Sequence, residues 1–124
     1  MGTQAIIAVK TTKGYTSVTV NYDGDTLLST LSKYYDTSFK ARELVNYGNI
    51  STLGKRIHPI GEHSFNNRED GTTTYYHRDR GEKLFKNTYR NQKQMFDFIK
   101  SMCCDYVYYF NGKEWKQAKN SQIK

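Results

Sequence analysis

The N-terminal stretch of the chain has the hydrophobic pattern of a β-hairpin. Residues 4–10 form an apolar run that is rich in β-branched side chains, and a turn containing Gly14 follows it. Residues 15–22 then alternate between polar and apolar positions, with Val18 and Val20 on one face. Alternation with a period of two is typical of a strand with one buried face, so the two stretches predict an antiparallel pair of strands.

Two helices are predicted after this hairpin. Leucine and tyrosine side chains between residues 27 and 35 fall on one helical stripe, and either Asp23 or Asp25 stands where it can cap the first turn. Ser38 is a suitable N-cap for a second helix, and Gly48 stands where a C-terminal glycine would end it. The apolar side chains of this second helix are Phe39, Leu44 and Val45.

The middle of the chain lacks a sustained period. Residues 48–71 contain four of the nine glycines, the single proline and two of the three histidines. A segment of this length without regular structure is unusual inside a compact domain and is often functional. The β-branched and aromatic run that follows predicts a strand over residues 72–77, which leads into a charged loop.

The C-terminal third begins with the clearest helical pattern of the chain, over residues 90–102. Its apolar side chains stand at i, i+3, i+4 and i+7, so we expect them to be buried and truncation of Phe98 to alanine to cost about 3–5 kcal/mol. Residues 106–110 alternate again, Asn111-Gly112 is a strong hairpin turn, and residues 113–116 supply the return strand. The side chains expected on the buried face of the helix are Met95, Phe98, Ile99 and Met102.

Together, these patterns predict an α+β fold in which an antiparallel sheet of about five strands carries about three helices packed on it. A length of 124 residues is typical of one domain and is enough for one hydrophobic core, so we expect a single domain over residues 1–124. Residues 116–124 are mostly polar and are expected to form a frayed tail.

Charge and cysteine content narrow the possible chemistry. The net charge of +7 favours anionic partners, although the lysines are scattered and many small basic proteins bind nothing through their charge. The adjacent Cys103 and Cys104 fit neither a disulfide framework nor a zinc site, and the histidines have no metal-binding spacing, so we expect no metal and no cofactor. The apolar N-terminal run is too short for a signal peptide or a membrane span, which predicts a cytoplasmic protein.

The most highly charged stretch is His77–Glu82, which contains Arg78, Asp79 and Arg80. An arginine fork binds phosphate through two parallel hydrogen bonds. The alternative is a surface cluster of ion pairs, each contributing about 0–1 kcal/mol. We predict that this loop ends a strand at the mouth of an anion pocket, with Arg80 as the main phosphate ligand, because Gly81 allows the backbone to turn after it.

Further side chains are candidates for the same site. Asp79 or Glu82 is expected to brace a guanidinium or to accept a hydrogen bond from a ribose hydroxyl. His63 is a candidate phosphate donor, and Phe65 is either a stacking partner for a base or a hydrophobic plug that pins the irregular segment to the core. The remaining candidates for ligand binding are His77, Arg78, Arg90, Asn91 and Tyr109.

Seven short motifs, taken in order, resemble those of a group of small phage and prophage proteins. They are MGT, YDG, LLSTLSKYY, GNISTLG, EHSF, YHRDRGE and DYVYYFNGKEW, and they cover nearly the whole chain. In this order they are similar to the anti-Thoeris sponge proteins, which sequester a cyclic ADP-ribose made by bacterial TIR enzymes. The chain departs from the group at Gln4, where arginine is common, at Tyr22, where tryptophan is usual, and at His77, where glycine is frequent.

The resemblance implies a counter-defence protein that binds a cyclic nucleotide signal without cleaving it, in the cytoplasm of an infected bacterium. A pocket with nanomolar affinity, about 12 kcal/mol, is easier to close between two chains than inside one small domain, so we expect a homo-oligomer.

Other functions remain open at this point. One is a basic nucleic-acid-binding protein, and another is a protein–protein inhibitor of a host defence enzyme. The protein is not expected to be an enzyme, but a phosphodiesterase that uses His63 or His77 as general base is a lesser alternative.

Overall fold

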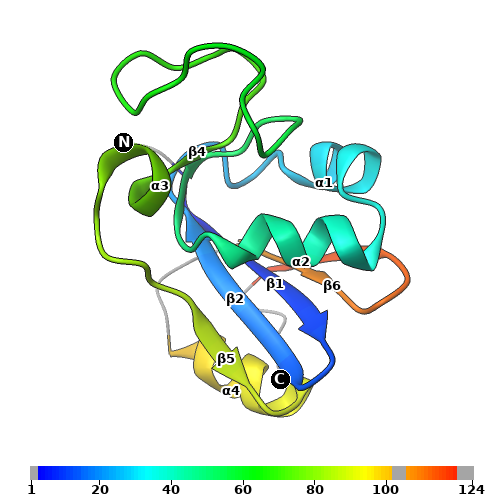
Figure 1. The fold of residues 1–124 in the computed structure, drawn as a ribbon. Helices are drawn as coiled ribbons and strands as arrows, with labels where there is room; N and C mark the ends of the chain where they lie inside the picture. The colour runs from blue at the N-terminus through cyan, green and yellow to red at the C-terminus, as the bar shows by residue number, and fades with distance from the viewer. Residues whose placement is uncertain (1–2, 102–105, 120–124) are drawn as a thin grey trace.

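A mixed β-sheet runs through the molecule and carries helices on both faces (Figure 1). The computed structural model describes residues 3–101 and 106–119. The strand order is β4-β3-β2-β1-β6-β7, and β5 pairs with β2 beside this path. The elements are β1 (Ala5–Thr11), β2 (Gly14–Val20), α1 (Leu28–Tyr34), α2 (Ser38–Asn46), β3 (Ile50–Thr52), β4 (Thr74–Tyr75), α3 (Tyr76–Arg80), β5 (Asn87–Tyr89), α4 (Gln92–Lys100), β6 (Tyr106–Phe110) and β7 (Trp115–Lys119).

The predicted N-terminal hairpin is confirmed. Strands β1 and β2 pair antiparallel in one continuous register, from Ala5 opposite Val20 to Thr11 opposite Gly14. Gly14 has a φ of +144°, and a Cβ atom there would lie 1.9 Å from the carbonyl oxygen of Tyr89. Glycine is therefore required where the hairpin turn meets the end of β5.

The α+β class is confirmed, but the expected antiparallel sheet of about five strands is wrong. The sheet has seven strands and is mixed, because β1 pairs parallel with β6 and β2 pairs parallel with β3. The described residues form four helices rather than three. The predicted strand over residues 72–77 is present only as the two-residue β4. Strands β3 and β5, which the sequence did not predict, have three residues each and are too short for an alternating pattern to reveal them.

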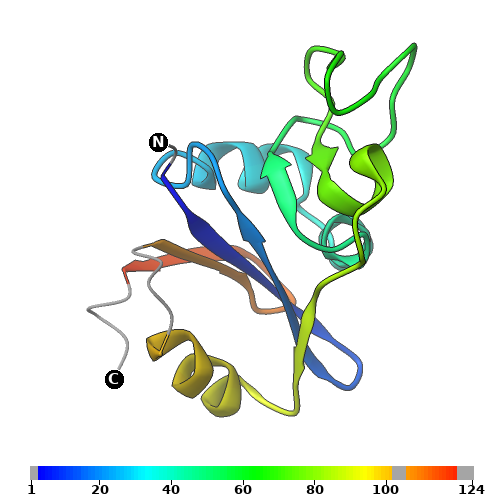
Figure 2. The same cartoon turned by 90° about the vertical axis from the view of Figure 1, so that its left-hand side faces the viewer.

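Each face of the sheet has its own apolar core. Helices α1 and α2 cover one face, where Ile7 and Val9 of β1 are buried. Helix α4 covers the other face, where Ile6 and Ala8 are buried (Figure 2). A strand that is buried on both faces has apolar residues at successive positions, which explains the apolar run over residues 4–10.

The first two helices lie where they were expected, but their caps differ. The N-cap of α1 is Leu27, which makes no side-chain cap, so neither aspartate has the predicted role. The N-cap of α2 is Thr37, whose hydroxyl accepts from the Lys40 amide at 3.2 Å, and Ser38 is already helical. Gly48 follows this helix with a φ of +86°, as predicted. Leu44 and Val45 of this helix are buried, whereas Phe39 is 69% exposed.

Helix α4 buries a narrower stripe than the sequence predicted. Met95 and Ile99 are fully buried against the sheet, but Phe98 is 43% exposed. Phe98 lies at the border of the stripe, where its ring centroid is 5.7 Å from that of Tyr89. The expected cost of truncating Phe98 was therefore too high, and Met102 lies outside the described residues.

The C-terminal hairpin of β6 and β7 is confirmed. Asn111 Oδ1 accepts hydrogen bonds from the amides of Lys113 and Glu114, each at 3.0 Å, and Gly112 has a φ of +99°. Residues 116–119 are paired in β7 and are not a frayed tail, whereas residues 120–124 lie outside the described part. None of the helices in the described ranges is long and apolar enough to cross a bilayer.

Candidate anion-binding site

The charged motif forms one helical turn, α3, instead of the predicted end of a strand. The strand β4 stops at Tyr75, whose amide donates to Asp79 Oδ2 at 2.7 Å. The turn is closed by Gly81, which has a φ of +78° and donates from its amide to the His77 carbonyl at 3.1 Å. A carboxylate that accepts from an amide at the start of a turn and a glycine at its end are both local helix signals, and here they override the β-prone residues before them.

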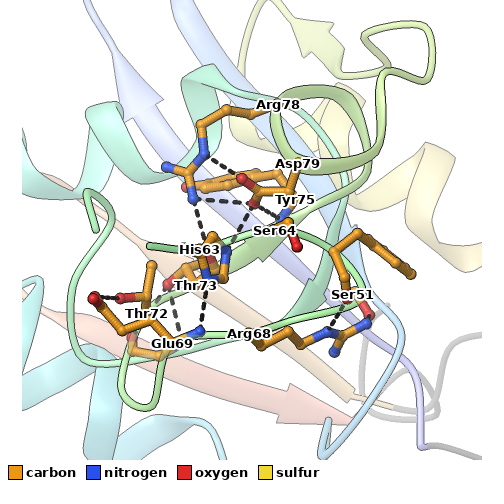
Figure 3. A network of polar contacts seen from close by, with 12 residues as sticks. Ser51, His63, Ser64, Arg68, Glu69, Thr72, Thr73, Tyr75, Arg78 and Asp79 are labelled. Carbon is orange, nitrogen blue, oxygen red and sulfur yellow. Dashed lines mark hydrogen bonds and ion pairs between the residues drawn. The ribbon is translucent and has the colours of Figure 1, made fainter. Parts of the chain in front are cut away.

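The guanidinium donors of Arg78 are occupied by acceptors inside the protein. The guanidinium donates two hydrogen bonds to Asp79, at 2.9 and 3.0 Å, and one to the Thr73 carbonyl at 2.9 Å (Figure 3). A fourth hydrogen bond goes to the Ile57 carbonyl at 2.6 Å. The guanidinium carbon also lies 4.8 Å from the ring centroid of Tyr75. Arg78 therefore ties the irregular segment to β4 and has little capacity left for a ligand.

Asp79 is the centre of this network. Its side chain is 6% exposed, and burial alone would raise the pKa of its carboxyl group. The hydrogen bonds from Arg78 and from the Tyr75 amide outweigh burial, so the pKa of Asp79 is lowered. His63 is fully buried beside it, with Nε2 at 3.4 Å from Asp79 Oδ2. Because His63 Nδ1 accepts from the Glu69 amide at 2.9 Å, its proton lies on Nε2 and faces the carboxylate.

Glu69 holds the rest of the irregular segment. Its carboxylate accepts from the amides of Ile60 and Gly61, from the Thr72 hydroxyl and from the Arg56 guanidinium, at 2.5 to 3.0 Å. These donors, the Ile60 amide first, lower the pKa of Glu69 to about 2. The segment predicted to be irregular thus contains β3, and its remainder between β3 and β4 is organised by polar contacts around the carboxylates of Asp79 and Glu69.

Phe65 connects this segment to α3. Its ring centroid lies 5.5 Å from that of Tyr76, and its amide donates to the Asp79 carbonyl at 3.2 Å. The guanidinium carbons of Arg68 and Arg80 lie 4.5 and 4.8 Å from the same ring. Phe65 is half-buried and packs against Tyr76 rather than into either apolar core, so it links the irregular segment to α3 and its ring lies beside the Arg80 guanidinium.

A surface hollow of about 420 Å³ lies next to α3, on the outer edge of β2. On this edge β5 pairs with residues 15–17 and β3 pairs with Val20. Between these two partners, the Thr19 amide donates to Asn49 Oδ1 at 3.1 Å instead of to a strand. The hollow opens where the two partner strands diverge, and it is lined by Thr19, Asn21, Asn49, Tyr76, His77, Arg80, Glu82, Lys83 and Phe85.

Three of the predicted site residues meet in this hollow. The Arg80 side chain is 54% exposed and pairs through Nε with Glu82 at 2.9 Å, and its terminal nitrogens make no hydrogen bond to the described residues. His77 Nδ1 lies 2.7 Å from the Glu82 carbonyl, so the proton is on Nδ1 and Nε2 is open. Lys83, which the sequence analysis missed, adds a second full positive charge. The hollow thus presents more positive than negative charge, with Phe85 at its rim, and is suited to an anion that also has an apolar face.

The remaining predicted residues lie elsewhere. Arg78, Asp79 and His63 belong to the buried network and do not line the hollow. Asn91 is the N-cap of α4 and accepts from the Gln94 amide at 2.9 Å, so Arg90 and Asn91 lie at the opposite end of β2 from the hollow. Tyr109 packs edge-on against Phe96, on the face that α4 covers.

Asn49 and Tyr76 were not among the predicted site residues, although Tyr76 opens the YHRDRGE motif, because only the pairing of distant strands brings them to this edge. Across the described ranges, no group of three His, Cys, Asp or Glu side chains is arranged to hold a metal ion. Comparison with protein-family models, with curated proteins and with solved structures gave no match.

Proposed function

We propose that the protein binds a cyclic ADP-ribose immune signal in the hollow beside α3 and holds it intact, which blocks a Thoeris-type bacterial defence. The observation that carries this proposal is that Arg78 is bonded inside the protein whereas Arg80 is exposed at the hollow. Arg78 is fixed by four internal hydrogen bonds, whereas Arg80 is half exposed over the Phe65 ring with its terminal nitrogens open. An aromatic ring that orients a free guanidinium prepares it for a phosphate.

The other groups of the hollow match the remaining parts of such a ligand. Lys83 and His77 Nε2 supply further contacts for a pyrophosphate. Glu82 and the amide of Asn49, whose Nδ2 donates no hydrogen bond within the described residues, suit the ribose hydroxyls. Phe85 is 58% exposed at the rim and offers a face for adenine.

The proposal includes a homo-oligomer in the host cytoplasm. The hollow is open at the surface, and an affinity near nanomolar, about 12 kcal/mol, requires a ligand that is largely desolvated. A second copy placed over the rim would supply the missing wall and would cover Phe85. Light scattering at micromolar concentration tests this part: a monomer, both with and without ligand, would rule it out.

Calorimetric titration with cyclic ADP-ribose isomers tests the binding site. Arg80→Ala is expected to weaken binding more than tenfold, about 1.4 kcal/mol, and to leave the melting temperature of the ligand-free protein nearly unchanged. Arg80→Lys is expected to fail as well, because an ammonium cannot form the two-pronged contact. The matched control is Lys113→Ala, which removes an exposed positive charge in the β6–β7 turn.

Equal binding by wild type and Arg80→Ala would refute the site, and no binding of any isomer would refute the ligand class. Mass spectrometry after denaturation of the complex separates sequestration from catalysis. An intact ligand is expected, whereas a hydrolysed ligand would identify a phosphodiesterase, with His77 as its candidate base.

A further inference from the structure

An extended segment joins α3 to β5 and descends along the edge of the sheet (Figure 1, Figure 2). Every residue from 81 to 88 is exposed, and β5 pairs only with β2, so its outer edge is open within the described residues. Lys83, Lys86 and Arg90 follow one another along this segment. An extended chain rises about 3.3 Å per residue, so neighbouring cations are roughly 10–13 Å apart along it.

Two surface hollows lie on this side and add further cations. One, of about 500 Å³, lies between α2 and the segment and is lined by Arg42 and Lys86. The other, of about 590 Å³, lies at the β1–β2 turn and is lined by Lys13 and Arg90. The two hollows share Thr11 and Thr16 of the hairpin, so they adjoin. We call the surface formed by Lys13, Arg42, Lys83, Lys86 and Arg90 the basic track.

The positive charge of the basic track is not neutralised inside the protein. None of its five cations forms an ion pair within the described part of the chain. Lys86 Nζ donates to the neutral Asn46 Oδ1 at 3.1 Å, and Arg42 Nε donates to the Ser38 carbonyl at 3.2 Å. The one carboxylate that lines either hollow, Glu43, lies 3.3 Å from His58 Nε2.

Apolar side chains are interleaved with these cations. Phe85 is 58% exposed, Leu84 is 38% exposed, and Phe39, which lines the hollow beside Lys86, is 69% exposed. Exposed aromatic rings beside a line of positive charge are the combination that holds unpaired bases and their backbone. A base-paired duplex offers phosphates but no free base faces, so it would leave these rings unused.

We propose that the basic track binds single-stranded nucleic acid, with the backbone along Lys83, Lys86 and Arg90 and a base stacked on Phe85. Contact is independent of sequence, because stacking and phosphate contacts do not read base edges. The basic track shares Lys83 and Phe85 with the hollow beside α3, so the two ligands would compete there. Lys86 and Arg90 do not line that hollow and Arg80 is not part of the track, so these residues distinguish the two functions.

Fluorescence anisotropy with labelled 12-nucleotide oligothymidylate and oligouridylate, between 50 and 300 mM KCl, tests the proposal. Each phosphate neutralised on a single strand contributes about −0.7 to the slope of log K against log salt, so contacts to Lys83, Lys86 and Arg90 predict a slope of about −2. Lys86→Gln/Arg90→Gln is expected to weaken binding more than tenfold and to reduce the slope by about 1.4. Phe85→Ala is expected to weaken binding about tenfold with the slope unchanged.

The matched control is Lys33→Gln/Lys113→Gln, which removes the same charge from exposed positions outside the track. An equal loss in this control would show that attraction is diffuse, and would overturn the proposal. The absence of binding at 50 mM KCl would also overturn the proposal. Equal competition by an oligoglutamate peptide would overturn it as well, and would indicate an acidic protein partner. Arg80→Ala should retain oligonucleotide binding, and Lys86→Gln/Arg90→Gln should retain nucleotide binding, so that failure of one function is distinguishable from failure of the other.

Discussion

Two arginines that are two residues apart offer the sharpest test of how this protein is organised. We predict that Arg78→Lys strongly destabilises the fold, whereas Arg80→Lys leaves stability almost unchanged. Arg78 donates to two carbonyl groups and twice to Asp79, from three different nitrogens. A lysine ammonium has one nitrogen and cannot reach the same set of acceptors.

The structure gives the size of the expected effect. If lysine keeps the pairing with Asp79, the carbonyls of Ile57 and Thr73 lose their charged donor. A hydrogen bond to a charged group contributes about 1.5–3 kcal/mol, and with water partly replacing the donor at this half-buried position the two losses amount to about 2–4 kcal/mol. For a domain of this length about 4 °C corresponds to 1 kcal/mol, so the melting temperature should fall by roughly 8–16 °C.

Arg80 provides the internal control for the same substitution. Its only ion pair within the described residues, to Glu82, joins side chains that are 54% and 47% exposed. Such a pair contributes about 0–1 kcal/mol, so Arg80→Lys should lower the melting temperature by less than about 4 °C. Thermal unfolding followed by circular dichroism, without ligand, measures both variants. Equal shifts in the two variants would refute the assignment of Arg78 as the internal tie and Arg80 as the free group.

Two further predictions follow from the core and from the irregular segment. Met95→Ala removes a fully buried side chain and should lower the free energy of unfolding, measured in urea, by about 2–5 kcal/mol. Phe98→Ala, at a position that is 43% exposed, should lower it by about 1 kcal/mol. The reverse order would show that α4 faces the sheet differently. Glu69 has a pKa of about 2 against an ordinary 4.5, so the unfolded chain takes up its proton first as the pH falls. The stabilisation by this carboxylate should be complete above about pH 4.5 and be lost as the pH falls through 2, and Glu69→Gln should be less stable at pH 7 and flatter between pH 4.5 and 2.5. A wild-type profile as flat as that of the variant would contradict the role of Glu69.

The sequence predicted those parts of the fold that depend on neighbouring residues. The period of two around Gly14 and the Asn111-Gly112 turn placed both hairpins, because each is closed by a local backbone conformation. The helical stripes placed α1, α2 and α4 within a few residues. Gly81 was correctly expected to turn the chain after Arg80, and its left-handed φ is what ends α3.

Other features were decided only by the tertiary structure. Strand direction depends on which distant segments pair, and no period in the sequence reveals that β6 lies parallel to β1 or that β3 lies parallel to β2. Phe39 and Phe98 have core-like positions in their helical patterns but are exposed, because the sheet covers only part of each helix.

The candidate site shows most clearly that local sequence patterns do not determine which side chains are buried and which are exposed. The charged motif contains His77, Arg80 and Glu82, which line the hollow, but local sequence could not separate Arg78 from Arg80. Their roles differ because Asp79 and two carbonyls from residues 57 and 73 converge on one guanidinium and not on the other. The Ile57 carbonyl belongs to a segment without periodicity, which is ordered by the donors gathered on Glu69. Local preferences thus determined the elements, and only long-range polar contacts decided which charge stays open to a ligand.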